Sequence, residues 1–263
     1  MNFKKKLLFT LLQSLFIFVN AQKISIYSDE YLPAKPYGGE GEVQLLFNNS
    51  LEYPDEAIKN KIEGDVFINF QVNTNGEVIK VEFDRESHEL LRKAALDVFK
   101  RILWEKYPNE PKSRLSDEKI KVSFRIKKYN KLVKKRGYKS LSELTPYEVD
   151  STLKVYNINQ VDEKVGVKNA SSVNDFVAQN FKFPGIALER GISGRVSVEF
   201  VVEPYGYISN VRITEPLAGG CNDETIRLMR AIEWEAAKVD GKAVRTLYRY
   251  QLNFINPGGS LSK

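Results

Sequence analysis

The side chains best suited to catalysis or metal binding are scarce in this sequence. Its 263 residues include one cysteine, Cys221, and one histidine, His88. One residue of each type supplies too few ligands for a structural zinc, haem or iron–sulfur site, and a single thiol excludes a disulfide framework. We therefore expect no metal and no cofactor. We expect Cys221 to be a small buried residue, although a thiol beside a helix N-terminus can instead have a lowered pKa.

Neighbouring carboxylates are the remaining candidates for acid–base chemistry. Asp223 and Glu224 stand together where a helix is expected to begin. Acidic side chains are favourable at that end of a helix for electrostatic reasons alone. The pair therefore needs no catalytic explanation, and we predict that the protein is not an enzyme, has no catalytic residue and takes no small-molecule substrate.

The first residues have the pattern of an export signal. Lys4, Lys5 and Lys6 precede an apolar run from Leu7 to Val19, and Val19-Asn20-Ala21 is typical of a cleavage site. As a helix the run extends about 20 Å, short of the roughly 30 Å hydrocarbon core of a membrane. We predict a cleaved signal peptide over residues 1–21, with a retained inner-membrane anchor as the alternative. Loss of these three lysines lowers the net charge from +6 to +3, too little to predict nucleic-acid binding.

An internal repeat organises the rest of the chain. At an offset of 130 residues, Tyr53–Trp104 aligns with Phe183–Trp234 without a gap. The identical pairs include Pro54 and Pro184, Gly64 and Gly194, Val66 and Val196, Phe70 and Phe200, Gly76 and Gly206, and Trp104 and Trp234. Such self-similarity indicates tandem homologous domains. We expect a first domain over residues 22–127, a polar connector over 128–152 and a second domain over 153–263.

Each copy carries a strand, a tight turn and a second strand. Apolar residues alternate with others over 66–72 and 196–202, which predicts a strand in each copy. Gly76 and Gly206 then supply the positive φ of a hairpin turn. A further alternating run, Ile120 to Ile126 or Tyr248 to Phe254, predicts a third strand, with a small length change between the copies after the tryptophans.

The remaining apolar patterns have helical spacing. One stripe runs from Leu91 to Ile102 behind Ser87 as a predicted N-cap, and another from Ile226 to Ile232 behind Asn222 and Asp223. Shorter helices are expected over 43–47 and 173–181, after each Pro, and within 140–144 of the connector. We predict that both tryptophans pack in the cores. The expected fold is α+β, with two small domains that each have a three-stranded antiparallel sheet and helices on one face.

These motifs together resemble the TonB C-terminal domain family. The first copy shows Leu51-Glu52-Tyr53-Pro54, then Gly64-Asp65-Val66, a glycine turn and a helix that closes at Trp104. The second shows Phe183-Pro184, Gly194-Arg195-Val196, Gly219-Gly220 before its helix, Trp234 and Gly241-Lys242-Ala243-Val244. The resemblance spans roughly residues 36–127 and 167–255. It implies a periplasmic domain with the three-stranded sheet described above.

The resemblance also implies a function in protein binding. Domains of this family take up an extended segment of TonB-dependent outer-membrane transporters by strand pairing, in support of transmembrane transport. Energy-transducing members have an uncleaved anchor and a Pro-rich spacer, whereas this chain has 10 prolines in total. The alternative is a structural adaptor of the cell envelope without a transport role, contacting other envelope proteins, and a homodimer is also possible.

The last strand of the second copy is the expected binding strand, because this copy keeps the fuller family pattern. Its residues are Tyr248, Arg249, Tyr250, Gln251, Leu252, Asn253 and Phe254. An unpaired strand edge offers main-chain donors and acceptors to another chain. Charged side chains can also blunt such an edge, and Lys119, Lys121, Arg125 and Lys127 of the first copy are consistent with that alternative.

Overall fold

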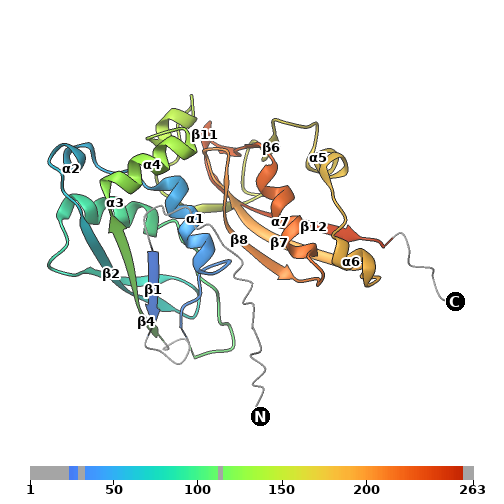
Figure 1. The fold of residues 1–263 in the computed structure, drawn as a ribbon, viewed down its shortest axis with the longest axis horizontal. Coiled ribbons are helices and arrows are strands. Elements are labelled where there is room, and N and C mark those ends of the chain that lie inside the picture. Colours follow the sequence, from blue (N-terminus) through green and yellow to red (C-terminus); the bar gives the residue numbers. More distant parts are fainter. Residues whose placement is uncertain (1–23, 29–32, 112–114, 257–263) are drawn as a thin grey trace, which may run out of the picture.

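The computed structural model describes residues 24–28, 33–111 and 115–256. The predicted signal peptide lies outside these residues. Two sheet-bearing halves lie next to each other (Figure 1), the first in blue and green and the second in yellow to red. Helices and sheets alternate along both halves, so the α+β fold class is confirmed.

The first half contains the three predicted strands and one more. β2 (Gly64–Asn73) lies between β3 (Val78–Phe83) and β4 (Leu115–Phe124), and both pairings are antiparallel. A fourth strand, β1 (Ile24–Ser28), pairs antiparallel with the other edge of β4. The helices are α1 (Glu40–Ser50), α2 (Asp55–Lys59), α3 (Glu89–Phe99) and α4 (Ile126–Arg136).

The second half repeats this arrangement. β7 (Gly194–Val202) lies between β8 (Ile208–Glu215) and β12 (Arg245–Phe254), again with antiparallel pairing. A short strand, β5 (Val155–Asn157), runs parallel to the start of β12. The helices are α5 (Val173–Asn180), α6 (Gly185–Glu189) and α7 (Cys221–Ala231). Two-stranded ribbons are formed by β6 (Gly166–Val167) with β9 (Trp234–Glu235) and by β10 (Lys238–Val239) with β11 (Lys242–Ala243).

The repeat keeps its offset through the last strand. Gly64 pairs with Phe124 in the first sheet, and Gly194 pairs with Phe254 in the second, so both partners differ by 130 positions. The prediction of a small length change after the tryptophans is therefore wrong, because the number of residues from Trp104 to Phe124 equals the number from Trp234 to Phe254. The first run also ends as a strand at Phe124, because Ile126 already belongs to α4.

Each half has its own hydrophobic core, built mainly on the helix-facing side of its sheet. Val66, Ile68 and Phe70 alternate inward along β2, and Val196, Val198 and Phe200 do so along β7. Trp104 and Trp234 are buried, as predicted. Their rings lie 5.0 Å from the ring of Phe70 and 5.3 Å from that of Phe200, respectively.

The helix caps differ from the prediction. The side chain of His88, not Ser87, caps α3 by accepting a hydrogen bond from the Leu90 N–H. The Ser87 hydroxyl instead donates to the Asp84 carbonyl and accepts from Arg92 Nε. In the second copy Gly220 is the N-cap of α7, and Asn222 Oδ1 accepts from the Leu217 N–H outside the helix.

The segment between the repeats holds more structure than a polar connector would. α4 packs Tyr129 and Leu132 into the first core and ends at Gly137, which has a left-handed backbone. The short helix expected after Ser140 is present as a 3-10 turn over Leu141–Leu144, closed by a capping box from Ser140 and Glu143.

The halves contact each other through α1 and the edge of β8 (Figure 1). Asn210 of β8 accepts a hydrogen bond from the Leu103 N–H at 2.7 Å and donates to the Arg101 carbonyl at 3.1 Å. The Val211 N–H donates to the Glu42 carboxylate at 3.3 Å. These bonds fix β8 against main-chain and side-chain groups of the first half.

Candidate functional site

The predicted binding strand is the middle and end of β12. Leu252 and Phe254 are buried on the core side of the sheet, and Tyr248 and Tyr250 pack against the same core. Arg249, Gln251 and Asn253 alternate with them on the other face and are exposed. The strand therefore has one face anchored in the core and one face in solvent.

Only one edge of this segment is occupied by a neighbouring strand. β7 pairs with β12 from Thr246 to Phe254. On the other side β5 pairs with Arg245–Leu247 and no further. Within the described ranges, no strand lies against the outer edge of residues 248–254. We call this seven-residue stretch the open edge.

The main-chain groups of Gln251 point toward the open edge. In an antiparallel pair, residues alternate between bonding to the partner strand and pointing away from it. The carbonyl of Ser197, which lies opposite Gln251, accepts a hydrogen bond from Thr214 on β8 and so points away from β12. Ser197 and Gln251 thus form a pair without mutual main-chain bonds. By the same alternation, Arg249 and Asn253 also direct their N–H and C=O groups outward.

The equivalent edge in the first half is covered. β1 pairs with residues 118–122 of β4, which correspond at the offset of 130 to residues 248–252 of β12. The Ile24 N–H donates to Gln44 Oε1 rather than to β4, so Ser25 and Lys121 form the mutually bonded pair. Ile24 and Ile26 pack against the first core. The same position of the fold thus accepts an extended antiparallel segment in one half and is open in the other.

Ion pairs fix the exposed face beside the open edge. Glu199 accepts hydrogen bonds from Arg249 and, at 2.7 Å, from Arg212. Burial of Glu199 would raise its pKa, but the bonds from Arg249 and Arg212 outweigh it and hold the pKa below its ordinary value. The carboxylate is therefore a permanent charge near neutral pH. It is a poor candidate for a general acid or base.

Two tyrosines support the core side of the open edge. Tyr248 packs its ring 5.2 Å from that of Trp234 and 5.6 Å from that of Phe200. The hydroxyl of Tyr250 donates to Asn174 Oδ1 of α5 at 3.1 Å. Burial raises the pKa of both phenols, so they stay neutral at physiological pH. They hold the strand in place.

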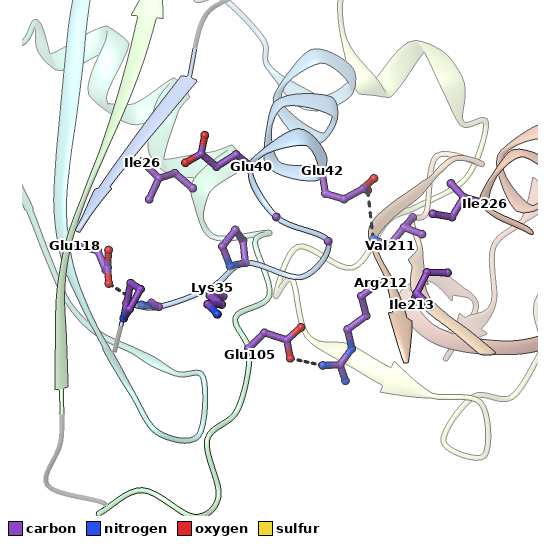
Figure 2. Close-up of a pocket in the computed structure, with 15 residues that line it drawn as sticks. Ile26, Lys35, Glu40, Glu42, Glu105, Glu118, Val211, Arg212, Ile213 and Ile226 are labelled. Carbon is purple, nitrogen blue, oxygen red and sulfur yellow. Dashed lines mark hydrogen bonds and ion pairs between the residues drawn. The ribbon is translucent and has the colours of Figure 1, made fainter. Parts of the chain in front are cut away.

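A pocket of about 730 Å³ lies between the halves and was not predicted (Figure 2). Its walls come from β1, α1, β4, β8, α7 and the chain before α1, so no local sequence pattern could have indicated it. Three of its charged groups are already paired: Glu42 accepts from the Val211 N–H, and Glu105 bonds to Arg212. The Ala34 N–H donates to Glu118 at 2.6 Å. This arrangement holds the halves together and offers no evident nucleophile.

The few chemically reactive candidates have structural roles. Cys221 is buried, and burial raises the pKa of its thiol, so the lowered pKa considered as an alternative is wrong. Glu224 is ion-paired with Arg227 and accepts from the Lys182 N–H at 2.7 Å, while Asp223 is exposed. In the part of the chain that is described, no cluster of His, Cys, Asp and Glu could hold a metal ion. None of the helices in that part is both long and apolar enough to span a membrane.

Comparison with known families finds a match in two separate stretches of the chain. The family model described as Gram-negative bacterial TonB protein C-terminal matches residues 49–126 and 179–255. One stretch lies within each sheet-bearing half and includes its central hairpin and its last strand. No curated protein matches the chain.

Proposed function

Because the chain belongs to the TonB C-terminal family, we propose that it is a periplasmic protein-binding module for TonB-dependent outer-membrane transporters. It would capture an extended transporter segment on the open edge of β12, in support of transport. The proposed binding residues are Tyr248, Arg249, Tyr250, Gln251, Leu252, Asn253 and Phe254. The proposal includes no enzymatic step.

The observation that carries the proposal is the contrast between the two last strands. β4 has an extended segment, β1, paired along residues 118–122, whereas the equivalent residues of β12 have none. Each outward residue of an open edge offers one N–H donor and one C=O acceptor. Each hydrogen bond made to one of these groups contributes roughly 0.5–1.5 kcal/mol net. Three such residues, Arg249, Gln251 and Asn253, alternate along this edge, which suits β-augmentation.

Export to the periplasm is part of the proposal. It is supported by the lysine cluster, the short apolar run and the Val19-Asn20-Ala21 site. A protein anchored by an uncleaved segment and facing the periplasm would present the same edge to the same partners. N-terminal sequencing of the mature protein distinguishes the two, because cleavage leaves Gln22 as the first residue.

The test replaces one outward main-chain donor. Gln251→Pro removes the N–H that points toward the open edge without removing a bond to β7. Binding of synthetic extended peptides from outer-membrane transporters, measured by calorimetry, should weaken by about tenfold or more. Gln251→Ala keeps the N–H and is the matched control, which should bind like wild type. Circular dichroism checks that both variants are folded.

Two results would contradict the proposal. A folded Gln251→Pro variant that binds as tightly as wild type would exclude pairing at this edge. If no transporter peptide binds wild type even at millimolar concentration, the structural adaptor of the envelope becomes the better assignment. In that case proteins retained from an envelope extract would identify the partner.

A further inference from the structure

β1 occupies the position on the first sheet that a captured segment would occupy on the second. Its five residues pair antiparallel with residues 118–122 of β4. Gln251 and Lys121 are equivalent, since each lies opposite the equivalent residue of the central strand, Ser197 or Phe67. The Phe67 carbonyl accepts from the Asp84 N–H, so it points away from β4 just as the Ser197 carbonyl points away from β12. Both last strands therefore present the same outward main-chain pattern.

We infer that the outer edge of β4 is a second binding site for extended transporter segments, and that β1 of the same chain blocks it. The inference rests on the proposed function and adds a regulated site to it. Displacement of β1 would expose the main-chain groups of Lys119 and Lys121, in the register that Arg249 and Gln251 offer on β12. One chain would then hold two segments instead of one.

The contacts of β1 are few enough to allow displacement. It pairs on one side only, whereas β2 is held between two strands. Ile24 and Ile26 are only partly buried, in contrast to Ile68 and Ile120 of the same core, which are fully buried. Peripheral elements with few buried apolar contacts open at a much lower free energy than the global unfolding free energy.

The covalent connection between β1 and the rest of the first half explains why β1, and not a free segment, would normally occupy the edge of β4. A segment joined to its site by a short stretch of chain acts at an effective concentration in the millimolar range. A free peptide at micromolar concentration cannot compete with it unless its intrinsic affinity is correspondingly higher. The second site would thus fill only when transporter segments are concentrated locally or when β1 is pulled away.

β1 also indicates which segments the edge accepts. Its pairing is antiparallel, and its two isoleucines lie two residues apart on the core side. The lysines of the β4 edge are already neutralised, Lys121 by Asp65 at 2.7 Å and Lys119 by Asp84 at 3.2 Å. The site therefore calls for an extended segment with β-branched apolar residues at alternate positions, and it does not require an acidic one.

The experiment counts binding sites on the full chain by calorimetry. The probes are the transporter peptide that binds wild type most tightly and a synthetic peptide with the sequence of residues 22–28. Ile24→Asp with Ile26→Asp places two charges against the core and should release β1. We expect the transporter peptide to bind at one site per wild-type chain and at two sites per released chain. A chain that begins at Pro33 makes the same test if the double variant fails to fold.

Matched proline variants assign the gained site. In the released chain, Lys121→Pro should remove the new site and Gln251→Pro the original one, so each leaves a single site. An unchanged number of sites after release overturns the second site but leaves the proposed function intact. A gain that survives Lys121→Pro, or a released β4 that takes only the 22–28 peptide, also overturns it. Absence of transporter-peptide binding in wild type instead overturns the proposed function itself.

Discussion

Glu203 is a fully buried carboxylate at the contact between the two halves. It accepts hydrogen bonds from Arg245 at 2.9 Å and from the Ser209 hydroxyl at 2.6 Å, and Arg101 of the first half lies at 3.5 Å. Burial would raise its pKa, but Arg245 and Arg101 outweigh it and hold the pKa below its ordinary value. The folded state therefore binds this proton less readily than the unfolded state does.

We predict that Glu203→Gln lowers the free energy of unfolding by about 3–5 kcal/mol at neutral pH, because the buried guanidinium of Arg245 and the partly buried one of Arg101 lose their carboxylate. The stabilisation from Glu203 is fully present above the unfolded pKa, about 4.3, and is lost as pH falls through the lower folded pKa. Urea unfolding at a series of pH values measures this. The difference between wild type and variant should shrink in acid, and a difference independent of pH would contradict the prediction.

The hairpin glycines provide a second test at the residue scale. Gly76 and Gly206 have φ values of 76° and 87°, which disfavour any residue with a Cβ. A Cβ at Gly76 would lie 2.5 Å from the Trp104 carbonyl oxygen, whereas at Gly206 the corresponding distance to Trp234 is 3.2 Å.

Both alanine variants should lose roughly 1–2 kcal/mol from the left-handed backbone. Gly76→Ala should lose more than Gly206→Ala, because the carbonyl of Trp104 must also move. Chemical denaturation of the two variants gives the comparison. Equal losses would mean that the Trp104 loop adjusts without cost.

At the scale of elements, the sequence predicted the helices and strands that have strong apolar periodicity. The short edge strands depend on tertiary contacts instead. The hairpins and the helices behind them follow from alternation, glycine turns and apolar stripes that recur in both copies. β1 and β5 are five and three residues long, too short for alternation to be a reliable signal, and they become strands by pairing with the edges of β4 and β12. Whether an edge is open therefore could not be predicted from the sequence, although the strand itself could.

The helix caps show the same limit on a smaller scale. Ser87 has the residue type of an N-cap, but Arg92 binds its hydroxyl, and His88 takes the capping role. The competing partner is one turn along the helix and depends on the loop conformation. Sequence preference alone cannot rank the two residues.

α4 is the helix whose contribution to the core was hardest to predict from composition. Lysines dominate its sequence, yet Tyr129 and Leu132 are buried in the first core. We predict that Leu132→Ala lowers the free energy of unfolding by about 2–3 kcal/mol, as for other buried leucines. Lys131→Ala, at an exposed neighbouring position, should change it by less than about 0.5 kcal/mol. If urea denaturation gives equally small effects for both variants, α4 acts only as a linker.

On the scale of the whole molecule, the repeated sequence does not repeat its contacts. The residues that join the halves have no counterparts at the offset of 130: Asn210 aligns with Lys80, and Arg212 with Glu82. The edge of β8 is therefore specialised for the first half, whereas the edge of β3 is exposed. This difference also explains why the contact between the halves was not predicted from the repeat.

We expect the thermodynamic coupling between the halves to be most sensitive to substitution of Asn210. It adopts a φ of 52°, and its side chain bonds to both the Leu103 N–H and the Arg101 carbonyl. Asn210→Gly keeps this backbone conformation accessible but removes both bonds, and Asn210→Ala adds strain to the same loss.

We predict one calorimetric transition for wild type and two separated transitions for both variants, since each half has its own core. Lys80→Ala, at the equivalent exposed position, should keep a single transition. Splitting in Asn210→Ala alone would attribute the effect to backbone strain. Unchanged melting of both variants would mean that the remaining ion pairs carry the coupling: Glu42 with Arg230, Glu105 with Arg212, and Arg101 with Glu203.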